Sequence, residues 1–208
     1  VLLKNLRDRL TKDTPEADLA DRALTETERA ATVFQSLLMI AQIEGGSAKS
    51  RFEAVDLAEI VSTFVEIYAP AAEDNGHSLT MELLPEKPVV VHGDKTLLGQ
   101  LIANLIENAL RHTPAGSGIS LGLVLTPQEI VLTVADDGPG IPEGERSNVL
   151  RRLYRLERSR TTTGNGLGLS LALAIAELHG ARLRLLDNSP GLLIEVAFPL
   201  PARDQRHC

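Results

Sequence analysis

An acidic, glycine-rich turn constrains this chain more than any other stretch. Its residues are Asp136-Asp137-Gly138-Pro139-Gly140. It follows residues 130–134, a run of β-branched and apolar side chains that predicts a strand. Glycine and proline end that strand, and the glycines let a ligand approach the backbone closely. A carboxylate held at such a turn can accept a hydrogen bond from an exocyclic amine, and a solvated hairpin turn is the alternative.

A helix predicted over residues 94–112 has a polar face that contains two asparagines. Asn104, Asn108 and Arg111 recur at i, i+4 and i+7 and therefore share one face. Asparagine is a poor residue for a helix interior. Its amide oxygen can ligate Mg²⁺, and an arginine can neutralise a phosphate. A solvated polar face is the alternative, and His112 is interpreted as a surface residue whose charge suits the end of the helix.

Three alternating glycines, Gly164, Gly166 and Gly168, lie at the start of a helix predicted over residues 167–179. They would expose backbone N–H groups at the helix N-terminus, an arrangement that binds phosphate. The spacing matches neither the Walker nor the dinucleotide-binding pattern, and a flexible loop is the alternative. The preceding segment, 143–165, is long and arginine-rich, as a mobile lid would be. We expect one or two of its arginines to contact phosphate, although solubility alone would also explain them.

Together the three segments describe a nucleotide site without a P-loop. The acidic turn would bind the base, and the asparagine face would hold the metal. The glycine turn and the arginine-rich loop would hold the phosphates.

The composition excludes several classes of protein. The 208 residues carry a net charge of −7, which argues against direct nucleic-acid binding because that needs a basic surface. The single cysteine, Cys208, is too few for a disulfide framework or a Cys-based metal site. No run approaches the length of a membrane span, and no signal peptide is recognisable. Because the chain does not start with methionine, we expect a piece of a longer protein, with any membrane segment outside these residues.

Two helices joined by a short loop are predicted at the N-terminus. The second, from Thr14 to about Ile43, repeats its apolar positions every seven residues. The two rows of this seam are Leu24, Ala31 and Leu38, and Thr27, Phe34 and Ala41. A helical hairpin alone has too little core, so we expect two copies to form a four-helix bundle in a homodimer. Packing of the hairpin on its own chain is the alternative.

Beyond these helices the pattern changes to mixed helices and strands. Asp56 and Asp94 are predicted to cap two helices that end near residues 75 and 112. Strands are predicted over residues 78–84, 89–92, 119–125, 129–135, 182–186 and 192–198. The fold class is therefore α+β, a helical hairpin followed by a two-layer α/β sandwich with helices on one face of a mixed sheet. The predicted divisions are a hairpin over 1–46 that lacks its start, a linker over 47–55, a second domain over 56–200 and a tail over 201–208.

These segments resemble the sensor histidine kinases of two-component systems, within the superfamily of gyrase, Hsp90 and MutL ATPases. Residues 104–109 are similar to the N box, and residues 136–140 are similar to the G1 box, with Asp137 where Asn is frequent. Residues 153–155 resemble the F box, with leucine where phenylalanine is usual, and residues 164–169 resemble the G2 box. The resemblance covers residues 52–200 and implies the GHKL-type ATP-binding fold. The hairpin is similar to the dimerisation and phosphotransfer helices.

The resemblance also implies a role for individual residues. Asp136 would accept a hydrogen bond from the adenine amine of ATP, and Asn108 would ligate Mg²⁺ with Asn104 nearby. Arg111 and a lid arginine, Arg160, would contact phosphates, which makes Asn104 and Arg160 the catalytic candidates. Further contacts to the nucleotide are implied for His112, Gly138, Gly140, Ile141, Gly164, Gly166, Leu167 and Gly168. Hydrolysing relatives have a glutamate where Asn104 stands, so its absence fits transfer to a protein acceptor rather than to water.

The activity implied is that of an ATP-dependent protein-histidine kinase that passes phosphate to an aspartate on the receiver domain of a response regulator. The implied setting is the cytoplasmic part of a bacterial inner-membrane sensor. One feature departs from the family: no histidine precedes His77, so the chain as given would be unable to phosphorylate itself at the usual site. The simplest explanation is that the chain starts just past that position or lacks a short stretch, and a degenerate kinase, or a non-catalytic module that binds nucleotide, is the alternative. A hydrolysing ATPase is a weaker one, because Asn104 offers no strong base.

Overall fold

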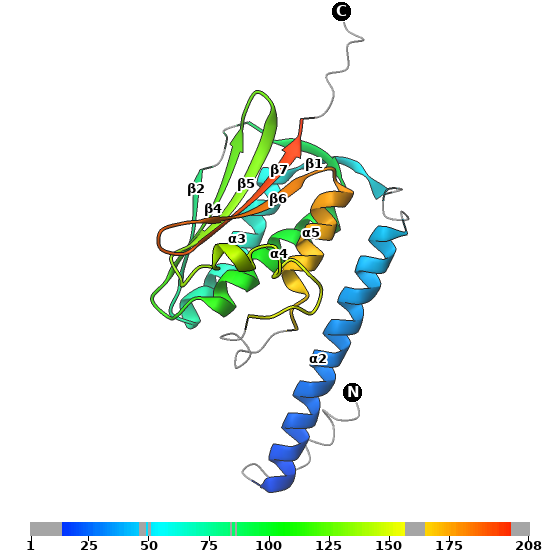
Figure 1. Cartoon of the computed structure of the whole chain (residues 1–208), viewed down its shortest axis with the longest axis vertical. Coiled ribbons are helices and arrows are strands. Elements are labelled where there is room, and N and C mark those ends of the chain that lie inside the picture. Colours follow the sequence, from blue (N-terminus) through cyan, green and yellow to red (C-terminus); the bar gives the residue numbers. More distant parts are fainter. Residues whose placement is uncertain are drawn as a thin grey trace, which may run out of the picture. The chain divides into compact units, whose positions relative to one another are not determined.

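A computed structural model of the chain describes residues 14–45, 49, 51–83, 85, 87–156 and 165–200 (Figure 1). The chain divides into two compact units, residues 1–39 and 40–208, and each is described by itself. The predicted first helix and the predicted tail lie outside the described residues. None of the helices in the described ranges combines the length and the apolar character that crossing a bilayer requires.

Helix α2 spans Pro15–Glu44, close to the predicted range. Thr14 caps it, because its Oγ1 accepts a hydrogen bond from the Ala17 N–H at 3.2 Å. In the predicted heptad seam, the side chains of Phe34 and Leu38 are 62% and 46% exposed. Large apolar side chains on this helix are therefore open to solvent, and the four-helix bundle in a dimer stays a prediction.

From residue 51 on, the described residues form a five-stranded mixed sheet, a two-stranded sheet and three α-helices. The elements are β1 (Glu53–Asp56), α3 (Leu57–Asp74), β2 (Ser78–Leu83), β3 (Val90–Gly93), α4 (Lys95–His112), β4 (Gly118–Leu125), β5 (Glu129–Asp136), the short 3₁₀ helix η2 (Glu143–Glu145), α5 (Gly168–Leu178), β6 (Arg182–Asp187) and β7 (Leu192–Pro199). The large sheet has the order β2-β4-β5-β7-β6, in which only the β2–β4 pair is parallel. The predicted α+β class and the predicted strands are confirmed to within a residue or two at their ends.

The large sheet packs one face against α3, α4 and α5 (Figure 1). Alternation along β5 shows how: Ile130, Leu132, Val134 and Asp136 are buried, whereas the residues between them are partly exposed. Successive strand residues point to opposite faces, so the row that contains Asp136 is directed at the helices. The last residue of β5 therefore carries a carboxylate into the layer between sheet and helices.

Part of the predicted linker over 47–55 forms a strand, and the predicted division of the chain stays a prediction. Residues 53–55 belong to β1, which pairs antiparallel with β3. Val55 lies opposite Val91 in this pair, and both are buried. A four-residue strand with one buried apolar side chain has no recognisable local pattern, because its partner strand is more than thirty residues away in the sequence.

A buried cluster around His179 joins the segment before β1 to the ends of two helices. The ring of Phe52 stacks on His179 with centroids 4.7 Å apart. His179 Nε2 accepts the Asp94 N–H at 3.1 Å, and Nδ1 donates to the Ile175 carbonyl at 2.7 Å. Burial lowers the pKa of His179, although the Ile175 carbonyl and the charge of Asp94 oppose that shift. The neutral imidazole is therefore the form that this packing favours.

Asp94 forms the predicted cap of α4 and also belongs to this cluster. Its Oδ1 accepts hydrogen bonds from the N–H groups of Thr96 and Leu97 at 2.9 and 3.2 Å. Its Oδ2 accepts from Arg51 Nε at 2.7 Å. Burial by itself raises the pKa of Asp94, but these hydrogen bonds and the charge of Arg51 outweigh burial and lower it. The charged carboxylate therefore stabilises the start of α4.

Candidate functional site

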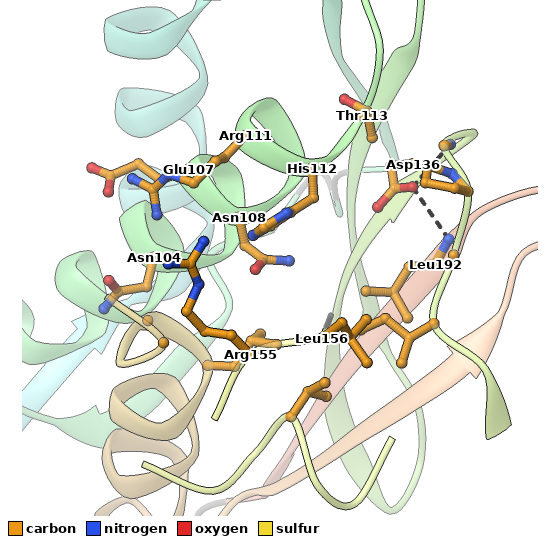
Figure 2. Close-up of a pocket in the computed structure, with 18 of the residues that line it drawn as sticks. Asn104, Glu107, Asn108, Arg111, His112, Thr113, Asp136, Arg155, Leu156 and Leu192 are labelled. Atoms are coloured by element: carbon orange, nitrogen blue, oxygen red, sulfur yellow. Dashed lines mark hydrogen bonds between the residues drawn. The ribbon is translucent and has the colours of Figure 1, made fainter. Parts of the chain in front are cut away.

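A cavity of about 670 Å³ lies between α4 and the loops that follow the sheet strands (Figure 2). Its walls come from α4, the acidic turn after β5, the loop over 149–156, the start of α5 and the first residue of β7. This volume is within the roughly 300–1,000 Å³ of pockets that hold small molecules and cofactors. The cavity thus brings together the acidic turn, the asparagine face of α4 and the glycine turn, which are separated by tens of residues in the sequence.

Most of the predicted site residues line this cavity. They are Asn104, Asn108, Arg111, His112, Asp136, Gly138, Gly140, Ile141, Gly166 and Gly168. Leu167 is not among the lining residues: it precedes α5 and is 3% exposed. Arg160 and Gly164 lie outside the described residues. The lining residues that the sequence analysis did not single out include Glu107, Thr113, Val149, Tyr154, Leu169 and Leu192.

Helix α4 contributes one wall through four side chains at i, i+3, i+4 and i+7. They are Asn104, Glu107, Asn108 and Arg111, and Figure 2 shows them on the side of the cavity opposite Asp136 and Leu192. The other faces of α4 bury apolar residues such as Leu101 and Leu105. Packing therefore fixes the rotation of α4 and turns its polar face to the cavity.

The side-chain amide of Asn104 places a hydrogen-bond donor without a partner at the cavity wall. Its Nδ2 atom is buried and has no hydrogen-bond partner among the described residues. A buried, unpaired amide costs free energy, so it points to a group that completes the site. The amide oxygens of Asn104 and Asn108 are suitable ligands for a hard cation. The described residues contain no group of three or more His, Cys, Asp or Glu side chains that could hold a metal.

The opposite wall contains Asp136, which is 7% exposed. Its Oδ1 accepts hydrogen bonds from the N–H groups of Gly138 and Leu192 at 3.0 and 3.3 Å. Burial raises the pKa of Asp136, and the charge of Asp137 adds to this shift, while the two N–H groups oppose it. With Oδ1 occupied, the other carboxylate oxygen is the one left to accept a hydrogen bond from a bound molecule.

The two acidic residues of the turn have different structural roles. Asp137 is exposed, and its Oδ1 accepts the Gly118 N–H at 3.0 Å. It thereby joins the turn to the start of β4. Asp136 alone of the pair has a buried carboxylate. The structure thus separates a carboxylate that holds the turn from one that can contact a ligand.

The loop after the acidic turn is joined to its surroundings at several points. Tyr154 donates from its hydroxyl to Glu145 Oε2 at 2.6 Å, and Arg146 Nε donates to the Ile141 carbonyl at 3.1 Å. The Leu153 N–H donates to the Gly166 carbonyl at 2.9 Å. The described part of this loop therefore closes one side of the cavity, and its movement as a lid stays a prediction.

Residues 93–202 match the family described as "Histidine kinase-, DNA gyrase B-, and HSP90-like ATPase". The probable sensor histidine kinase TcrY of Mycobacterium tuberculosis is 36% identical over 151 residues, which are 72% of this chain and 31% of TcrY. The chain thus spans about a third of the length of this curated relative.

Two solved structures have a similar fold. The mycobacterial sensor histidine kinase MprB aligns with a TM-score of 0.60 and 29% identity, covering 71% of this chain and 97% of the other. Full-length ShkA in complex with AMPPNP aligns with a TM-score of 0.74 and 22% identity, covering 95% of this chain and 41% of the other. The chain therefore belongs to the histidine kinase-, DNA gyrase B- and HSP90-like ATPase family, on the branch of the two-component sensor histidine kinases.

Proposed function

We propose that this chain is the catalytic core of a sensor histidine kinase and that its cavity binds ATP with Mg²⁺. The observation that carries the proposal is the arrangement of Asp136 across the cavity from the amide face of α4. The free oxygen of Asp136 accepts a hydrogen bond from the adenine amine. The apolar side chains of Ile141 and Leu192, which also line the cavity, contact the base. The end of the cavity that binds adenine is thereby separated from its polar end, where the phosphates lie.

The polar end is formed by α4 and the start of α5. Asn108 is the metal ligand, with Asn104 beside it, and bound Mg²⁺ would neutralise charge that develops on the phosphates. Arg111 pairs with a phosphate oxygen, and the backbone at Gly166 and Gly168 approaches the phosphates at the N-terminus of α5. Arg160 and Gly164, which belong to the segment outside the described residues, are proposed as further phosphate contacts. Catalysis then depends on positioning and charge neutralisation, as in other phosphoryl transfers.

The whole protein is proposed to act on partners of two kinds. The exposed apolar side chains of α2 support a homodimer through the N-terminal hairpin. The γ-phosphate would go to a histidine and then to an aspartate on a response regulator receiver domain. We propose a cytoplasmic location for this core, in a parent protein anchored in the membrane. Nucleic acid is not a proposed partner, since the net charge is −7.

Calorimetric titration with ATP tests nucleotide binding directly. We expect saturable binding of one ATP per chain, weakened when Mg²⁺ is removed with a chelator. Arg111→Ala should weaken ATP more than adenosine, because only ATP has the phosphates that the guanidinium contacts. Absence of saturable ATP binding, or equal losses for ATP and adenosine, would contradict the proposed orientation of the nucleotide.

A labelling experiment separates a kinase from the second candidate, a non-catalytic module that binds nucleotide. That candidate is kept because no histidine precedes His77 in the sequence. The longer parent protein is incubated with γ-labelled ATP, and the label is tested for stability in acid and in base. Phosphohistidine is labile in acid and stable in base, so a label of that kind supports the kinase. Binding without any transferred label would favour the non-catalytic module.

A further inference from the structure

The turn between β6 and β7 contacts the acidic turn through a side chain that no sequence motif indicates. Asn188 Nδ2 donates a hydrogen bond to the backbone carbonyl of Asp136 at 2.8 Å. The two residues are 52 positions apart in the sequence. The contact therefore joins the proposed base-binding carboxylate to a different part of the fold.

This hydrogen bond continues the sheet beyond its last backbone pair. The β5–β7 ladder ends with Ala135 opposite Leu193. Past that point, the carbonyl of Asp136 accepts from the side chain of Asn188, and the Oδ1 of Asp136 accepts from the Leu192 N–H. The β6–β7 turn and the first residue of β7 thus hold the backbone and the side chain of Asp136.

The glycine between these two contacts allows the close approach. Gly191 has a φ of +116°, and a Cβ built on it would lie only 1.7 Å from the carbonyl oxygen of Asp136. No side chain fits at that separation. A Cβ on Gly140, further along the acidic turn, would lie 2.6 Å from the Gly191 carbonyl oxygen. The two turns are therefore packed backbone to backbone.

A second side chain joins the same two segments from the other end. Arg146 Nε donates to the Ile141 carbonyl at 3.1 Å, and its Nη2 lies 3.6 Å from Asp187 Oδ1. Arg146 is partly buried, with 22% of its side chain exposed. The β6–β7 turn is thus connected to both ends of the acidic turn.

We propose that Asn188 is a positioning residue that sets the direction of the Asp136 carboxylate and so makes the site selective for a 6-amino purine. Asn188 does not line the cavity, so it acts through Asp136. A hydrogen bond depends steeply on its angle, and a shift of the turn would cost the bond to the amine while leaving the phosphate contacts on α4 unchanged. This inference rests on the proposed function, because it takes ATP as the ligand of the cavity.

The test compares ATP with inosine triphosphate, which has a carbonyl in place of the amine at carbon 6. Ribose, phosphates and Mg²⁺ are the same in both, so the ratio of the two affinities isolates the contacts at the 6-position and at the adjacent N1, which carries a hydrogen only in inosine. We expect the unmodified chain to prefer ATP by about tenfold or more, the size expected for a hydrogen bond to a charged group. In Asn188→Ala this preference should fall towards one, chiefly through weaker ATP binding.

Asn75→Ala is the matched control. Asn75 Nδ2 also donates to a backbone carbonyl, that of Ala71 at 2.6 Å, but at the end of α3 and away from the cavity. Its substitution should leave the preference for ATP unchanged. If Asn188→Ala does not fold, Asn188→Asp replaces it, because the carboxylate has nearly the same shape but no donor for the Asp136 carbonyl.

The outcomes distinguish this inference from the proposed function. If the unmodified chain binds neither nucleotide, the proposed function fails. If it prefers ATP and both Asn188 variants keep that preference, or lose both affinities in equal proportion, the positioning role is overturned while the proposed function stands. Equal binding of ATP and inosine triphosphate by the unmodified chain overturns the positioning role as well.

Discussion

Replacing the Asp136 carboxylate with an amide should separate nucleotide binding from folding stability. In Asp136→Asn the acceptor for the Gly138 and Leu192 N–H groups can be kept, but the free oxygen becomes an NH₂ group that faces the adenine amine. A hydrogen bond to a charged group contributes about 1.5–3 kcal/mol. The dissociation constant for ATP should therefore rise by about 10- to 150-fold.

The same substitution should not reduce stability at neutral pH. Burial raises the pKa of Asp136, which means that the folded chain disfavours the charged carboxylate. The contribution of Asp136 to the stability of the fold is fully present below the pKa that this group has in the unfolded chain. It is lost as pH rises through the pKa that the group has in the folded chain. At pH 7 a neutral amide of the same shape therefore leaves the melting temperature unchanged or raises it.

Asp94→Asn is the matched control, since Asp94 is also buried but has the opposite pKa shift. Arg51 stabilises the charge of Asp94. The resulting stability of the fold is present above the pKa of Asp94 in the unfolded chain and is lost as pH falls through its lowered pKa in the folded chain. We expect a loss of about 1 kcal/mol, or about 3 °C in melting temperature for a domain of this size. ATP affinity should be unchanged, because Asp94 does not line the cavity.

Calorimetric titration and thermal melts of both variants complete the test. The pH dependence provides a second measurement: ATP affinity of the unmodified chain should fall as pH drops through the raised pKa of Asp136, because the protonated acid is a poorer acceptor. A loss of melting temperature in Asp136→Asn as large as that in Asp94→Asn would refute the reasoning. So would an ATP affinity in Asp136→Asn within twofold of the unmodified chain.

Four further predictions concern other parts of the chain. Asn108→Ala should weaken ATP binding in the presence of Mg²⁺ and much less in its absence, measured by titration with and without a chelator. Gly191→Ala should destabilise the fold by about 1–3 kcal/mol in denaturant melts, because its φ of +116° is strained for alanine and a Cβ would meet the Asp136 carbonyl. Stability should fall as pH drops through the lowered pKa of His179, since protonation is easier in the unfolded chain, and His179→Gln should remove part of that slope. Phe34→Asp should shift the chain towards monomer in light scattering, because it puts a charge in the predicted dimer seam.

Each of these expectations has a result that contradicts it. If Asn108→Ala lost equal ATP affinity with and without Mg²⁺, Asn108 would not be the metal ligand. An unchanged denaturation midpoint in Gly191→Ala would mean that the two turns can separate freely. A His179→Gln variant with the full pH dependence would assign that dependence to another group, and a monomeric unmodified chain at micromolar concentration would count against the dimer.

Local patterns were sufficient to predict the α-helices and the strands of the second unit, apart from β1. Asn104, Asn108 and Arg111 share a face because of the helical period alone, and their apolar neighbours on α4 determine which way that face points. Asp136 follows a strand with strict alternation, so its direction into the layer between sheet and helices also depends on a local rule. The resemblance to histidine kinases, which uses the same short segments, is confirmed by the matched family.

The sequence by itself thus determined the family, the order of the elements apart from β1, and most of the side chains that face the cavity from α4 and β5. Only the tertiary structure decided that Asn188 and Leu192 hold Asp136, that Asp137 instead joins the turn to β4, and that residues 53–55 pair with β3. The physical reason is that periodicity and turn chemistry act over a few residues. Hydrogen bonds across 52 positions depend on strand register and on the close backbone packing at Gly191, which no local pattern encodes.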